Sequence, residues 1–403
     1  MRFEYNFYSS FLLVFFIHGL VYAGMVWVKG LRRENPSDLW LAFFLLLGQL
    51  YILPWMVGFA GWYDNQPYRD LLFYVPFQHL YLLGPVVYFY VQSLLNPGFV
   101  FSRKKLLHFL PAALYLLYCL VVFITDKLVL HRYYFLYNEA DPDFDTWYQV
   151  TGFLSMFFYF GLSYRYYRVY RRLIVQVVSY ADTLHFFWIK RFLMAFLLIL
   201  LVRALFYILD LVWGYWYTDT WWYYLAFALI VYYIAITGYS NSMVSRIAFR
   251  FKFFQEKKVY LLSGAGKQLE DLEEIEISEP DQETSTAAKE ANSQWMEKVR
   301  EAMENGKAYT DPELTLTQLA KQLGTNSSLL SKVINQGYKS SFNDMVNAYR
   351  VAAMKEKLVQ KEHHRQTLLA IAFECGFNSK ATFNRAFQRH TGQSPRDFAK
   401  DLE

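Results

Sequence analysis

The fold of the C-terminal part is decided by residues 367–387, TLLAIAFECGFNSKATFNRAF. Thr367 and Ser379 each precede a run of apolar residues at helical spacing, and Gly376 separates the two runs. The apolar residues are Leu368, Ile371 and Ala372 in the first run and Phe383, Ala386 and Phe387 in the second. Ser and Thr are favoured at helix N-caps, and glycine gives a tight turn its backbone freedom. The stretch therefore predicts a helix-turn-helix unit.

The same pattern occurs about fifty residues earlier, in residues 315–334, TLTQLAKQLGTNSSLLSKVI. Thr315 and Gln318 have the spacing of a capping box, and Asn326 is placed to cap the second helix. The two copies align at Thr315 and Thr367, Ala320 and Ala372, Gly324 and Gly376, and, with one extra residue in the later turn, Leu330 and Phe383 and Lys332 and Arg385. A helix from about residue 342 to 359 joins them. The C-terminal part is thus predicted to be an all-α internal repeat.

The repeat resembles the DNA-binding domain of AraC-type transcription regulators. The resemblance rests on IAFECGF at 371–377, FNRAF at 383–387 and GQSP at 392–395, together with Phe342, Asn347 and Arg350 in the joining helix. It covers about 293–401 and does not extend to the N-terminal half. The usual sensory domains of that family are soluble, so this chain looks like the membrane-bound members found in some bacteria.

The resemblance implies that the second helix of each copy enters a major groove, one helical turn of DNA (about 34 Å) apart. By position, the base contacts would come from Ser328, Ser331 and Lys332 in the first copy and from Lys380, Ala381, Asn384 and Arg385 in the second. Thr382 would hold a phosphate. Because serine side chains are short, the first copy is expected to contribute more to position than to specificity. The alternative is that these residues are merely solvated helix faces.

The N-terminal half carries most of the aromatic residues and long apolar runs. Seven runs are expected to cross a membrane, near 8–28, 39–60, 72–95, 106–125, 147–167, 192–213 and 221–243. About 20 residues of helix span the roughly 30 Å of hydrocarbon in a bilayer. Residues 192–202 and 225–236 have no polar face, as a soluble core helix of that length would have. The sequence therefore predicts a seven-helix transmembrane bundle.

Basic residues alternate between the loops of this bundle. The basic segments follow the odd-numbered spans and contain Lys29, Arg32 and Arg33; Arg103, Lys104 and Lys105; Arg168, Arg171, Arg172, Lys190 and Arg191; and Arg246, Arg250, Lys252, Lys257 and Lys258. Because cytoplasmic loops carry an excess of Lys and Arg, the N-terminus is expected outside and the C-terminus inside. We therefore expect a multi-pass protein of the bacterial inner membrane with its DNA-binding domain in the cytoplasm.

The predicted domains are a transmembrane sensor at 1–243, a linker at 244–290 and the DNA-binding domain at 291–403, an all-α architecture. Residues 246–258 are basic with interleaved Phe, which fits either an anionic membrane surface or an extension of the seventh helix. Residues 270–283 are acidic and predict solvated linker. The two cysteines, Cys119 and Cys375, lie in different domains, so no structural disulfide is expected.

Ionisable and polar residues inside membrane spans are costly and therefore candidates for function. Arg203 and Asp210 share a face of the sixth span, and Gln78 and His79 lie in the outer half of the third. They suggest a polar cavity, open to the outside, for a small or lipidic effector. The alternative is structural: Arg203 pairs with a neighbouring helix and Asp210 lies at the water interface.

The sequence favours a one-component transcription regulator over other classes of membrane protein. A retinal protein needs a Lys within the seventh span, which has none, and His18, His79 and His108 do not pair in depth as haem ligands would. An enzyme or transporter with a regulatory tail is the alternative, but no catalytic or cofactor-binding motif is evident, so no enzyme activity and no cofactor are expected. The expected partners are promoter DNA, membrane lipids and an unknown effector; a homodimer is left open. The signal is expected to pass through the last span and the linker.

Overall fold

The computed structural model describes residue 4 and residues 6–137, 141–181, 187–214, 216, 218–241, 249–252, 255–262, 272–276 and 286–402. The chain forms two compact units. The N-terminal unit comprises Met1–Tyr167 and Phe186–Val244, and the C-terminal unit comprises Arg168–His185 and Ser245–Glu403. One break lies next to the predicted boundary at 243. The other separates residues 168–185 from the predicted membrane domain and places them with the C-terminal unit.

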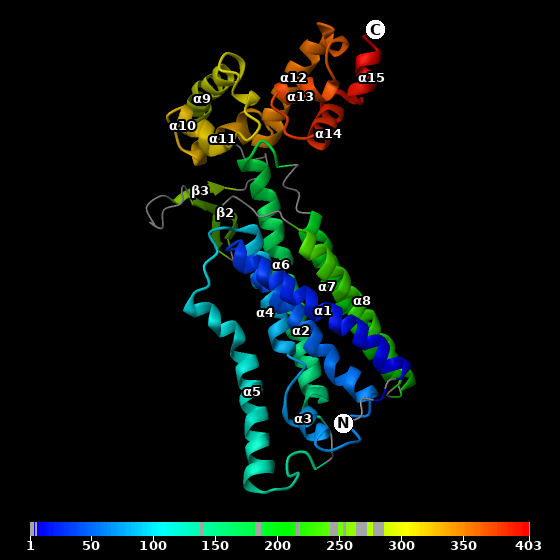
Figure 1. Ribbon diagram of the computed structural model, residues 1–403. Helices are drawn as coiled ribbons and strands as arrows, with labels where there is room; N and C mark the ends of the chain where they lie inside the picture. The colour runs from blue at the N-terminus through cyan, green and yellow to red at the C-terminus, as the bar shows by residue number, and fades with distance from the viewer. Residues whose placement is uncertain are drawn as a thin grey trace. The chain divides into compact units, whose positions relative to one another are not determined.

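The N-terminal unit is helical (Figure 1). Its α-helices are α1 Phe7–Arg32, α2 Pro36–Phe59, α3 Tyr68–Tyr74, α4 Leu80–Leu95, α5 Leu110–Phe123, α6 Thr146–Val177, α7 Phe187–Trp213 and α8 Trp221–Ser240. Short 3₁₀ helices, η1 Arg103–Phe109 and η3 Pro142–Phe144, and a π turn, η2 Ile124–Val129, complete it. The last turns of α6 belong to the C-terminal unit.

Among the described residues, five helical segments are long and apolar enough to cross a membrane: Phe7–Arg32, Pro36–Phe59, Arg103–Val129, Trp188–Trp213 and Trp221–Ser240. The predicted count of seven is therefore not exact. The third predicted span is broken, because α3 ends at Tyr74 and Pro76 follows. A proline disfavours helical backbone in the residue before it. The fifth, α6, is helical but, with its arginines, is less apolar than these five.

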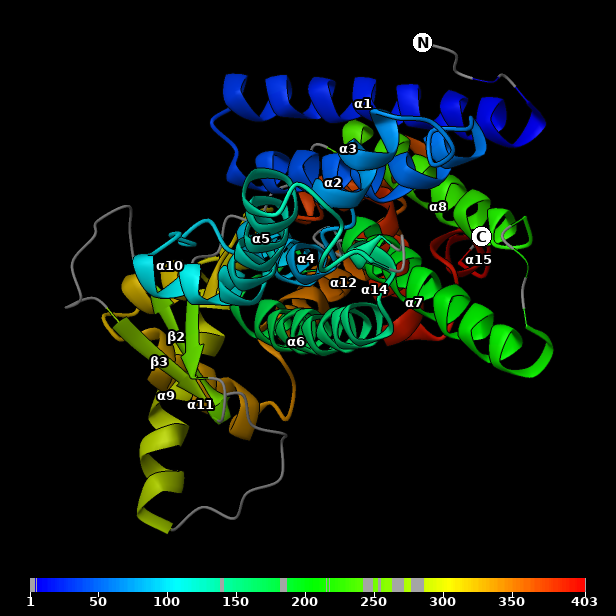
Figure 2. The same ribbon diagram turned by 90° about the horizontal axis from the view of Figure 1, so that it is seen from below.

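Within this unit α2 is central and α1 peripheral (Figure 2). In the most apolar stretch of α2, 72% of the residues are buried, against 22% in α1. Large apolar side chains of α1 such as Val14, Ile17 and Val21 are exposed on the protein surface. Contiguous apolar surface of this extent is rare on soluble monomers and is typical of a face covered by lipid.

The C-terminal unit contains the predicted repeat. Its α-helices are α9 Thr286–Glu304, α10 Leu316–Gln322, α11 Ser327–Gly337, α12 Phe342–Val359, α13 Leu368–Glu374, α14 Lys380–Thr391 and α15 Pro395–Lys400. Two short 3₁₀ helices, η4 Ala308–Thr310 and η5 Glu362–His364, lie between them. α10 and α11 form the first helix-turn-helix unit, α13 and α14 form the second, and α12 joins them as predicted.

The four predicted N-caps are confirmed. Thr315 accepts a hydrogen bond from the Gln318 backbone and Gln318 accepts one in return, which completes the capping box. Asn326, Thr367 and Ser379 each accept a hydrogen bond from the backbone N–H three residues ahead. These bonds fix where each helix of both copies begins.

Each copy has its own apolar core. In the first, the buried side chains include Leu316, Leu319, Ala320, Leu330, Val333 and Ile334. In the second they are Ile371, Ala372, Cys375, Phe377, Phe383, Ala386 and Phe387, packed on Val351, Met354 and Leu358 of α12. α12 therefore supports the second core directly and connects it to the first.

The segment between the membrane helices and α9 was predicted as a linker, but part of it forms strands. β1 Phe249–Lys252, β2 Gln255–Leu262 and β3 Leu272–Glu276 form an antiparallel sheet in the order β1-β2-β3. Phe249, Val259 and Ile275 are fully buried, so alternation of apolar side chains on one face explains the strands. A helical extension of the seventh span is therefore wrong for these residues. β3 packs against α11.

Candidate nucleic-acid interface

The second helix of the second copy, α14, has one buried and one exposed face. Phe383, Ala386 and Phe387 are buried in the core. Four residues predicted to contact bases, Lys380, Ala381, Asn384 and Arg385, are all exposed. Their spacing of one, three and one residues places them together on one side of the helix. The exposed face thus combines two cations with an amide.

Thr382, which the sequence placed on a phosphate, is buried in the cap of α14. Its side chain is 1% exposed, and its Oγ1 lies 2.9 Å from the Oγ of Ser379. Its backbone N–H donates to the same Ser379 Oγ at 3.2 Å. Thr382 therefore takes part in the hydrogen bonds that start α14, and its contact with a phosphate stays a prediction.

The corresponding face of α11 is less open. Lys332 is exposed and Ser328 is half-buried, but Ser331 is only 4% exposed. A buried short hydroxyl is poorly placed to reach a base edge. The two copies are therefore unequal in the residues they present as well as in composition, with more exposed donors on α14.

An ion pair that the sequence did not suggest ties α14 to α12. Arg389, in the last turn of α14, pairs with Asp344, and its Nη2 lies 3.2 Å from Asp344 Oδ2. A bidentate arginine–carboxylate pair holds a defined geometry. The pair links α14 to the joining helix, and the local sequence around either residue gives no sign of it.

The comparisons with known proteins agree with this geometry. Residues 319–401 match the model of a family described as a helix-turn-helix domain. The chain is 28% identical over 105 residues to uncharacterized HTH-type transcriptional regulators of Staphylococcus aureus strains COL, MSSA476 and N315. The C-terminal domain of this chain is therefore a helix-turn-helix domain of the AraC type, as its sequence suggested.

The similarity covers a small part of the chain. The alignment covers 26% of this chain and 14% of each of those regulators, so the chain spans about one seventh of the length of the curated relatives it matches. No solved structure matches the chain. The N-terminal unit must be interpreted from its own residues.

In that unit, two of the predicted effector residues lie in one buried network. Arg203 of α7 is 5% exposed, and its guanidinium donates to the hydroxyls of Tyr223 at 3.0 Å and Tyr207 at 2.9 Å, to that of Tyr51 and to the Gln149 side chain. Gln149 also donates to the Gln78 side chain at 2.9 Å. Residues from α2, α6, α7 and α8 therefore meet Gln78 around one buried cation.

The other two predicted effector residues lie elsewhere. His79 is half-buried at the start of α4, and Asp210 is exposed near the end of α7. Asp143, a buried residue of η3 between α5 and α6, contacts the break before α4. It accepts hydrogen bonds from the backbone of Phe77 at 2.7 Å and Gln78 at 2.9 Å. The four residues thus do not form a single cluster.

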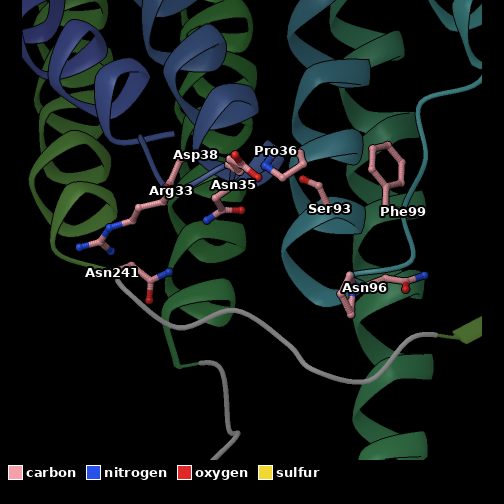
Figure 3. A pocket seen from close by; sticks show the side chains of 10 residues that line it. Arg33, Asn35, Pro36, Asp38, Ser93, Asn96, Phe99 and Asn241 are labelled. Carbon is pink, nitrogen blue, oxygen red and sulfur yellow. The ribbon is translucent and has the colours of Figure 1, made fainter. Parts of the chain in front are cut away.

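Sequence reasoning missed a pocket at the opposite end of the bundle (Figure 3). Its volume is about 320 Å³, and it lies between the α1–α2 turn, the end of α4 and the end of α8. The residues lining it are Arg33, Glu34, Asn35, Pro36, Asp38, Ser93, Asn96, Pro97, Phe99 and Asn241. The nearest sequence signal is the basic last turn of α1, where Lys29 pairs with buried Asp38 at 3.6 Å.

Proposed function

We propose that this chain is a membrane-anchored, one-component transcription regulator that binds promoter DNA in a sequence-specific way. The observation that carries the proposal is the exposed face of α14 inside a repeated AraC-type domain. Lys380, Asn384 and Arg385 share that face and are exposed. This set of donors suits major-groove recognition better than general attraction to phosphate.

The chemistry of that face suggests a division of labour. Arginine can donate two hydrogen bonds to guanine O6 and N7, and asparagine can pair with adenine N6 and N7. Arg385 and Asn384 are therefore assigned to base recognition, with Lys380 at the start of the helix. On α11, Lys332 takes the base contact, while Ser328 and Ser331 mainly set position.

The membrane anchor and its orientation rest on composition. Five segments among the described residues have the length and hydropathy of membrane spans. The alternation of basic loops supports an outside N-terminus and a cytoplasmic C-terminal unit in a bacterial inner membrane. DNA is accessible to the domain only in that orientation.

Effector sensing is assigned to the Arg203 network. Among the described residues, the Arg203 guanidinium is held by tyrosine hydroxyls and an amide and by no carboxylate, which leaves its charge incompletely neutralised. An effector with an anionic or strongly accepting group would stabilise one arrangement of these helices over another, as any ligand-driven shift requires. A target-promoter reporter that still responded normally to its inducer in an Arg203→Ala variant would contradict this assignment.

The DNA-binding proposal is tested with the full chain in lipid nanodiscs and a pool of random duplexes. We expect selection of a defined sequence, and we expect Arg385→Ala to weaken binding to it by about five- to 150-fold, the 1–3 kcal/mol of one bidentate base contact. Arg300→Ala removes the same charge from exposed α9 and serves as the control.

Equal effects of the two substitutions would mean that α14 contributes only charge. Failure of the wild-type chain to enrich any sequence would favour the alternative class, a membrane transporter or enzyme that carries this domain as a regulatory tail.

A further inference from the structure

The last turns of α6 are amphipathic in an unexpected place. Tyr170, Leu173, Ile174 and Val177 recur at the i, i+3, i+4, i+7 spacing of one helix face, and each is less than 5% exposed. Arg168, Arg171 and Arg172 lie on the exposed side. These turns belong to the C-terminal unit, where the ring of Tyr170 lies 6.0 Å from that of Phe249 in β1, measured between ring centroids.

The turn that follows α6 is joined to the first helix-turn-helix copy by backbone pairing. Val178 forms an antiparallel bridge with Thr315, the N-cap of α10. The backbone N–H of Ser179 donates to the Leu314 carbonyl at 3.1 Å. Val178 and Ser179 are fully buried. The segment is therefore an integral edge of this domain.

α12 presents a matching row of polar side chains. Asn343, Asn347 and Arg350 lie four and three residues apart on one face and are at most 4% exposed. Asn343 Nδ2 donates to the Val178 carbonyl at 3.4 Å, and Asn343 Oδ1 accepts a hydrogen bond from Asn347 Nδ2 at 3.1 Å. Unpartnered polar groups at such depth are costly, so the turn supplies partners that the row needs.

Arg350 makes the strongest part of this contact. Its Nη1 donates to the Ser179 carbonyl at 3.2 Å and its Nη2 to the Ser179 Oγ at 3.0 Å. The same guanidinium donates to the Tyr309 carbonyl at 2.8 Å and the Asp311 carbonyl at 2.6 Å. One side chain therefore links the turn after α6 to the segment preceding α10 and to the helix that joins the two copies.

We propose that the row Asn343–Asn347–Arg350, with Leu314 and Thr315, is a docking surface for the turn at Val178–Ser179, and that α6 couples the membrane bundle to the DNA-binding domain. α6 is one continuous helix from Thr146 to Val177 and contributes Gln149 to the Arg203 network near its start. Rotation or translation of α6 then moves the junction between the two copies. This inference rests on the proposed function and replaces the route through the last span and linker.

Docking is tested by oxidative crosslinking of the full chain in membranes. Val178→Cys with Thr315→Cys, and separately Ser179→Cys with Leu314→Cys, place thiols on paired strand positions, within the reach of a disulfide. A protease site introduced within residues 277–285 lets a crosslink be scored as two fragments that stay joined. We expect crosslinking at least about tenfold faster than for Val178→Cys with Lys321→Cys, whose partner lies six residues farther along, about 9 Å of helix.

Coupling is tested by helical phase. One alanine inserted after Tyr167 rotates the docking face by about 100° relative to the bundle, whereas seven alanines nearly restore its direction. We expect promoter occupancy to change at least about fivefold with one residue and to return towards wild type with seven. The same insertions within residues 277–285 are the control and should have little effect.

The outcomes separate this inference from the function it rests on. No crosslink in either pair, or equal occupancy for every insertion after Tyr167, would overturn the coupling while leaving DNA binding intact. If promoter occupancy changed only with insertions within 277–285, the signal would instead pass through the last span and the linker. Efficient crosslinking without any promoter occupancy would instead overturn the proposed function.

Discussion

At the scale of single residues, Cys375 offers a test of the second repeat's core. Burial raises the pKa of its thiol to about 11 from the usual 9.0. The thiolate is the reactive form, so its fraction at pH 8 falls about a hundredfold. We expect Cys375 to resist maleimide in native membranes and to react after unfolding in urea, as read by mass spectrometry. Rapid labelling of the native chain would contradict the packing of α13 on α12.

Asp143 gives a second residue-level prediction, on the loop before α6. Burial raises the pKa of this carboxyl to about 6, and it also raises that of neighbouring Asp141. Between pH 4 and 6 the folded state then binds more protons than the unfolded state, so stability falls as pH rises through this window. Thermal unfolding in detergent should show about 1 kcal/mol greater stability at pH 5 than at pH 7.

The variant Asp143→Asn is the control for that experiment. It removes the titrating group but keeps an acceptor for the backbone N–H groups of Phe77 and Gln78. The difference between pH 5 and pH 7 should shrink in this variant. An unchanged difference would assign the pH dependence to other groups.

At the scale of elements, we expect the two turns of the repeat to differ in how well they tolerate a side chain in place of glycine. Gly324 and Gly376 both have positive φ, +70° and +90°. A Cβ at Gly376 would lie 2.2 Å from the Tyr309 carbonyl, whereas nothing lies within 4 Å of one at Gly324. Gly324→Ala should cost about 1 kcal/mol from backbone strain alone, and Gly376→Ala at least about 3 kcal/mol. Pulse proteolysis in urea measures both, and equal costs would contradict the close approach.

Local signals explain what the sequence predicted well. Capping residues such as Thr315 and Ser379 act within one turn, so the repeat and its joining helix could be located from spacing alone. The outward face of α14 followed once its apolar face was known. Hydropathy likewise located the apolar helices, because a helix in lipid consists of an uninterrupted run of mostly apolar residues.

Non-local contacts explain what it missed. The stripe from Tyr170 to Val177 is visible in the sequence, but Val178, which follows it, pairs with Thr315, more than a hundred residues later. The burial of Ser331 and the pairing of Arg389 with Asp344 depend equally on distant segments. Pro76 could have predicted the break in the third span, but it lies within a long apolar run that was interpreted as one helix.

At the scale of the whole molecule, the topology is directly testable. Truncated fusions to alkaline phosphatase, which is active only outside the cytoplasm, should be active when joined at Asp141 and inactive when joined at Val100. Basic residues flank the second site and acidic residues the first. The reverse pattern would contradict the alternation of loops that seven spans with an outside N-terminus require.

Genome-wide mapping of the DNA bound by the membrane-inserted chain in its own cells tests most directly whether it regulates transcription. We expect enrichment at a small set of promoters that share one sequence motif. We also expect loss of that enrichment in Arg385→Ala and its retention in Arg300→Ala. Absence of promoter enrichment, or enrichment that survives Arg385→Ala unchanged, would contradict the claim that this chain regulates transcription through α14.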